Sequence, residues 1–140
     1  MILGGTWSVY WYNGAMYSSE ITRGLDIFEL APSAFISQNE IDAAKTVHFD
    51  YYNTQGQQKL VWPPSFALAR AYVDQLERSK GLTAGRISAA RQTLTTAEGS
   101  ANQRQRSLNT LAAQLDGDAR NSSDAPKVRA LASAVRNLAH

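Results

Sequence analysis

The sequence predicts an α+β protein, in which an N-terminal three-stranded antiparallel β-meander is followed by an antiparallel α-helical bundle. Two observations predict this class. Residues 6–30 contain short aromatic and β-branched runs separated by turn residues, a pattern typical of strands joined by hairpins. Residues 65–140 instead repeat apolar side chains at the three- and four-residue spacing of helices. We therefore divide the chain into a β segment at 1–32, a connecting region with one short helix at 33–64, and a helical bundle at 65–140.

Three strands are expected in the β segment. The first runs from Trp7 to Tyr12 and ends at Asn13-Gly14, the strongest short signal for a hairpin, because a type I′ turn requires positive φ at both central residues. Ala15–Ser19 is the return strand, and Thr22-Arg23-Gly24 is a second turn signal. Leu25–Leu30 is the third strand, which Pro32 follows.

These strands are apolar on both sides. In the first strand we expect Trp7, Val9 and Trp11 on one face and Tyr10 and Tyr12 on the other. A strand with one hydrated face alternates apolar and polar residues, whereas a strand covered on both faces does not. The cover can come from helices of this chain or from neighbouring sheets, as between the blades of a propeller.

The run WSVYWYNGAMYSSEITRGLDIFEL resembles one LVIVD-type repeat, the unit of a bacterial β-propeller-like family. Trp7–Tyr12 is similar to the first strand of such a repeat, Met16–Ser18 to the second, and Gly24–Leu30 to its closing turn and strand. Residues 32–82 are similar to the region that follows the last repeat in members of this family. The resemblance implies one blade-like repeat plus a helical tail, the C-terminal portion of a secreted or surface-associated, hence extracytoplasmic, protein.

The helices beyond the repeat are predicted from caps and apolar spacing. A capping box at Ser37–Glu40 begins a helix that is expected to run to about residue 48. The segment 49–62 is expected to be a loop or a loose hairpin about Thr54–Gln57. Pro63-Pro64 then ends the connecting region. Four bundle helices follow. They are expected from the Ser65 cap to about Ser79, from the Thr83 cap to Gly99, from about Ala101 to Asp116, and from the Asp124 cap to about Leu138.

The densest feature of the sequence is an aromatic cluster near the N-terminus, and we take it as a candidate partner surface: Trp7, Tyr10, Trp11, Tyr12 and Tyr17. Packing in a core or between blades is the competing role for these side chains. Nucleic acid is not an expected partner of this cluster, because residues 1–64, which contain it, carry three basic against six acidic side chains. Residues 65–140 carry eleven basic against six acidic side chains, spread among the helices.

No catalytic residue, metal site or cofactor is predicted. The chain has no cysteine and two histidines, His48 and His140, which form no metal-binding motif. Glu20, Asp26 and Glu29 are expected to pair with turns or to be hydrated. Residues 1–30 do not have the pattern of a secretory signal, and no apolar run approaches the roughly 20 residues of a membrane span.

The leading functional hypothesis is a non-enzymatic interaction or structural module. Its expected partners are the upstream β-repeats of a parent chain or another protein, with self-association as a further candidate. Two alternatives stay open: part of a propeller enzyme whose site lies in the missing repeats, and an independent small α+β protein.

Overall fold

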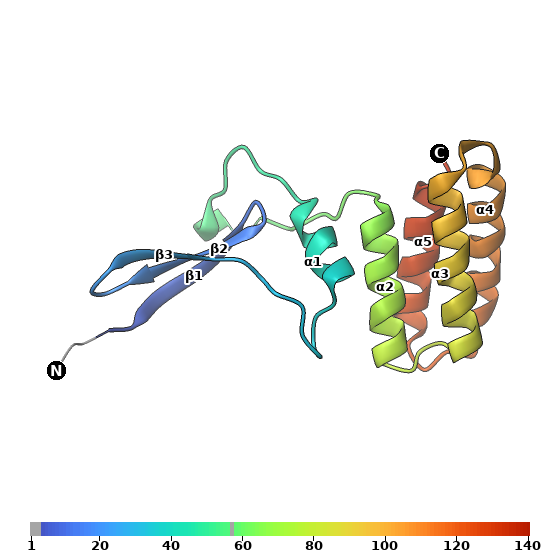
Figure 1. The fold of residues 1–140 in the computed structure, drawn as a ribbon, viewed down its shortest axis with the longest axis horizontal. Coiled ribbons are helices and arrows are strands. Elements are labelled where there is room, and N and C mark those ends of the chain that lie inside the picture. Colours follow the sequence, from blue (N-terminus) through green and yellow to red (C-terminus); the bar gives the residue numbers. More distant parts are fainter. Residues whose placement is uncertain (1–3, 57) are drawn as a thin grey trace. The chain divides into compact units, whose positions relative to one another are not determined.

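The computed structural model describes residues 4–56 and 58–140. The predicted fold class is confirmed, since an N-terminal three-stranded antiparallel sheet precedes the helices (Figure 1). The chain divides into two compact units, residues 1–63 and residues 64–140. Gln57, at the end of the turn considered at Thr54–Gln57, lies outside the described residues.

The sheet consists of β1 (Thr6–Tyr12), β2 (Ala15–Glu20) and β3 (Gly24–Phe28) in the order β1-β2-β3. Asn13 and Gly14 have φ values of 47° and 94°, as the predicted type I′ turn requires. Because β2 lies between the other two strands, the outer edges of β1 and β3 pair with no strand among the described residues.

The first unit continues with α1 (Gln38–Lys45), which begins with the predicted capping box. The Ser37 hydroxyl accepts from the Glu40 amide, and the Glu40 carboxylate accepts from the Ser37 amide. The helix ends at Lys45, before the predicted residue 48, because the Thr46 and Val47 amides donate to carbonyls three residues back, those of Ala43 and Ala44, and so tighten the last turn. A short 3₁₀ helix, η1 (Thr54–Gly56), lies in the following segment, whose other described residues form the expected loop.

Four helices form the second unit: α2 (Phe66–Arg78), α3 (Ala84–Gly99), α4 (Ala101–Asp118) and α5 (Ala125–Asn137). Both α2 and α4 pack against α3 and α5, so the four helices close into a ring around one core. Short connections between successive helices give the antiparallel bundle that the sequence predicts.

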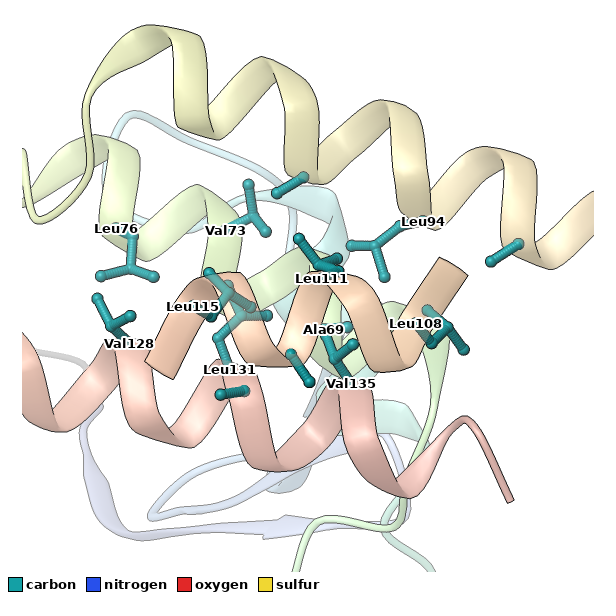
Figure 2. Packing of buried hydrophobic residues seen from close by; sticks show 14 of the residues in the cluster. Ala69, Val73, Leu76, Leu94, Leu108, Leu111, Leu115, Val128, Leu131 and Val135 are labelled. Atoms are coloured by element: carbon teal, nitrogen blue, oxygen red, sulfur yellow. The ribbon is translucent and has the colours of Figure 1, made fainter. Parts of the chain in front are cut away.

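The bundle core consists of the predicted leucine, valine and alanine stripes (Figure 2). Leu76, Leu94, Leu108, Leu115 and Leu131 are fully buried. Alanines between them allow the helices to approach closely, although each contributes less burial than a leucine. Among the described residues, no helix has the length and apolar content needed to cross a membrane.

Two predicted details of the bundle are wrong. The Asp124 side chain does not cap α5: it accepts from the Ser79 hydroxyl at 3.1 Å and pairs with Lys127 at 3.6 Å. The helix α4 continues through Gly117 to Asp118 instead of ending near Asp116. Arg86 donates to Asp118 at 2.8 Å, which fixes this last turn against α3.

Replacing Leu115 with alanine is expected to lower the free energy of unfolding of the bundle by about 2–5 kcal/mol, because it removes a fully buried side chain and leaves a cavity. Urea unfolding followed by circular dichroism measures this loss. Ala113→Ser, at an exposed position of α4, should change stability by no more than about 0.5 kcal/mol. Equal effects of the two substitutions would contradict the observed core.

Candidate functional site

The strand register places only part of the predicted aromatic cluster on one face. Tyr10 pairs with Tyr17, and Tyr17 pairs with Ile27, so these side chains share a face. Tyr12, two residues beyond Tyr10 on β1, lies on that face as well. The structure therefore brings three of the five predicted residues together, and we call this side of the sheet the tyrosine face.

The two tryptophans lie elsewhere. Trp11 pairs with Met16, and Met16 with Phe28, on the opposite face of the sheet. Trp7 is the unpaired extra residue of an irregularity in β1, because Thr6 lies opposite Glu20 while Ser8 lies opposite Ser19. Of the predicted common face of Trp7, Val9 and Trp11, the register places the last two together and gives Trp7 no cross-strand partner, since a bulge interrupts the two-residue alternation there.

A loop distant in sequence completes the tyrosine face. The ring of Tyr52 stacks on Tyr12, with centroids 6.3 Å apart and planes inclined by 29°. Tyr17 meets Tyr12 edge-on at 6.2 Å, and Phe49 packs against Tyr52 at 5.4 Å. These contacts form a continuous aromatic cluster between the hairpin and the segment 49–52.

Hydrogen bonds hold this loop against the hairpin. The Asn13 side chain donates to the Phe49 carbonyl at 3.0 Å and accepts from the Phe49 amide at 2.8 Å. The Tyr12 hydroxyl donates to the same carbonyl at 2.9 Å. The Asn13 side chain therefore pairs with the Phe49 backbone as a neighbouring strand would. We call the two hydrogen bonds between Asn13 and Phe49 the Asn13 clamp.

Together, the tyrosine face and the loop line an open groove with a volume of about 400 Å³. We call it the tyrosine groove; it is lined by Tyr10, Tyr12, Tyr17, Asp50, Tyr51, Tyr52 and Thr54. Sequence reasoning missed the last four of these residues. The adjacent aromatic pair Tyr51-Tyr52 in a loop was the available signal, but nothing local showed where that loop would lie.

Glu20 has a structural role in the sheet. Its carboxylate is nearly buried and accepts from the backbone amides of Gly5 at 2.7 Å, Thr22 at 2.8 Å and Arg23 at 2.6 Å, and from the Thr22 hydroxyl at 2.9 Å. These bonds, those from the Gly5 and Arg23 amides above all, lower the pKa of Glu20 from 4.5 to about 2, against the raising effect of burial. Glu20 thus anchors the β2–β3 turn, the turn-pairing role expected from the sequence.

The other candidate residues of the sequence, His48 and Asp26, are not among the described lining residues of the groove. Among the described residues, no three histidine, aspartate or glutamate side chains gather as metal ligands would. His48 is exposed. Asp26 forms a two-point ion pair with Arg23, at 2.7 and 3.2 Å. The described geometry offers an open groove lined mainly by aromatic side chains.

The clamp can be tested by Asn13→Gly, which keeps a residue suited to positive φ but removes both hydrogen bonds to Phe49. We expect amide hydrogen exchange at Phe49 to become about 10- to 100-fold faster, since two hydrogen bonds of about 0.5–1.5 kcal/mol are lost. Asn13→Asp retains the acceptor for the Phe49 amide and should have an intermediate effect. Unchanged exchange in both variants would show that the clamp does not position the loop.

The Glu20 carboxylate should make the stability of the sheet depend on pH. Because its pKa is about 2 when folded and near 4.5 when unfolded, its stabilising contribution is complete above pH 4.5 and is lost as the pH falls towards 2. Glu20→Gln should therefore be less stable than the native chain at pH 7, and the difference should narrow over this window. Urea unfolding followed by tryptophan fluorescence reports on the first unit, which contains Trp7, Trp11 and Trp62. The exposed Glu29→Gln is the control; a similar narrowing for this variant would contradict the assignment to Glu20.

Comparisons with protein-family models, with curated proteins and with solved structures found no match to this chain.

Proposed function

We propose that this chain is a non-enzymatic interaction module, in which the sheet of the first unit binds a β-structured partner. The observation that carries the proposal is the position of exposed apolar side chains. Of the described residues, every large hydrophobic side chain that is exposed lies between Trp7 and Trp62, in the first unit. Residues 64–140, all of them described, expose none.

Both faces of the sheet carry exposed apolar side chains. Val9 and Phe28 are 53% and 47% exposed on the face opposite the tyrosines, where Trp11 and Met16 lie beside Phe28 in the cross-strand register. Leu25 belongs to the tyrosine face through its pairing with Ser19 and is 58% exposed. Apolar side chains gathered in this way are typical of binding surfaces, whereas single exposed ones are ordinary.

A β-structured partner suits this surface for two reasons. Aligned sheets bury flat apolar faces against each other, and the unpaired outer edges of β1 and β3 offer backbone donors and acceptors to an added strand. The LVIVD-type resemblance suggests a source for the partner: the upstream repeats of a secreted or surface-associated parent protein, of which this chain is the C-terminal portion. The two-sided apolar character of the strands supports this source.

The proposal predicts that the isolated chain exposes a binding surface without its partner. It should bind the dye 8-anilinonaphthalene-1-sulfonate in native buffer and associate as its concentration rises in sedimentation velocity. The double substitution Val9→Thr and Phe28→Thr keeps residues that favour strands and should reduce both signals.

Ala113→Thr, at an exposed position on α4, is the matched control and should leave both signals unchanged. A chain that stays monomeric at all concentrations and binds no dye would refute the proposed function.

A further inference from the structure

We propose that the tyrosine groove binds a proline-rich segment of a partner protein that carries an arginine or lysine. This inference deepens the interaction role proposed above and rests on it. It concerns the tyrosine face, whereas Val9 and Phe28 lie on the opposite face, so the two surfaces can be tested separately.

The aromatic lining indicates a proline-rich ligand. Tyrosines from β1, β2 and the segment 50–54 form the walls of the groove. Proline-rich peptides adopt a polyproline II helix that has no internal hydrogen bonds and docks into grooves lined by aromatic rings. The volume of about 400 Å³ lies within the range of sites that hold compact ligands.

The tyrosine hydroxyls can bind the backbone of such a ligand. Tyr12 uses its hydroxyl to hold Phe49, whereas the hydroxyls of Tyr10, Tyr17 and Tyr51 make no hydrogen bond within the described part of the chain, and none of them is a buried unsatisfied group. They are therefore accessible donors. Because the carbonyls of a polyproline II helix are hydrated and free to accept, these hydroxyls and the ligand backbone are complementary.

The charge of the groove selects a basic ligand. Asp50 is the only charged residue among its described lining residues, and Asp50 is exposed. Residues 1–63 carry three basic and six acidic side chains, so the surrounding unit is also acidic. An anionic ligand would be repelled, whereas an arginine or lysine can pair with Asp50 and lie over a tyrosine ring.

Contacts within the first unit hold the walls of the groove in place. The Asn13 clamp and the stacking of Tyr52 on Tyr12 fix the loop against the hairpin. Binding a pre-ordered polyproline II segment to a pre-ordered groove loses little conformational entropy, which favours affinity for a short peptide.

The test uses the full chain and a fluorescein-labelled peptide of about ten residues, made of alternating alanine and proline with one arginine at its N-terminal end. Fluorescence anisotropy should show saturable binding. Tyr51→Ala, which truncates a loop side chain that is 74% exposed, should weaken binding about 5- to 30-fold. Asp50→Lys should weaken it about 3- to 10-fold for the arginine peptide, and less for a peptide with alanine in place of arginine.

Matched controls separate this site from the rest of the surface. Glu29→Lys makes the same charge change as Asp50→Lys beyond the end of β3, and Phe35→Ala truncates another exposed aromatic residue of the first unit, 88% exposed; both should bind the peptide as the native chain does. The Val9→Thr and Phe28→Thr variant should also bind it normally.

Absence of peptide binding to the native chain, or equal weakening by Glu29→Lys and Asp50→Lys, would overturn this inference. If the chain bound no peptide but dye binding and association through Val9 and Phe28 persisted, the proposed interaction with a β-structured partner would stand and the peptide site alone would be refuted. Association of the native chain that Tyr51→Ala and Asp50→Lys abolish, without peptide binding, would make a second copy the occupant and would equally overturn the proposal.

Discussion

The Asn13-Gly14 turn is the constraint on which the first unit depends. Both residues have positive φ, a conformation that asparagine and glycine adopt more readily than other residues. Gly14 is also buried, and a Cβ atom there would lie 3.3 Å from Cγ of Lys45. Asn13 meets the turn requirement and, with the same side chain, holds Phe49. One dipeptide therefore sets the hairpin register and the position of the loop that completes the tyrosine groove.

The two units differ in how completely each buries its apolar side chains. In the bundle, each helix has two neighbours, so an apolar stripe finds a partner within the same ring. A three-stranded sheet has two faces and two edges, and the segment 49–54 contacts it near the hairpin end, around Tyr12. Leu25 and Ile27 on β3 remain 58% and 60% exposed. The uncovered surface thus follows from the geometry of a small sheet, which needs more cover than this loop provides.

Sequence reasoning found the strands and helices because their signals are local. Apolar periodicity, the caps at Ser65 and Thr83, and the Asn13-Gly14 turn all act over a few residues. The groove could not be found in this way, because its walls come from distant parts of the chain. The hydrogen bonds that hold Tyr52 near Tyr12 join Asn13 to Phe49, which is 36 residues away in the sequence. The irregularity at Trp7 also went unforeseen: one unpaired residue in β1 shifts the register, so that Thr6 lies opposite Glu20 while Ser8 lies opposite Ser19.

The alternation of side chains along β1 gives the sheet two different surfaces. Tyr10 and Trp11 are adjacent in sequence but lie on opposite faces. A neighbouring sheet packs about 10 Å from the one it covers, and on the tyrosine face Phe49 and Tyr52 already occupy part of that space. A second sheet therefore meets an obstacle on the tyrosine face but finds Val9, Trp11 and Phe28 on the other. On the two proposals above, a partner sheet on that face would leave the groove open, so the two partners would not compete for the same surface.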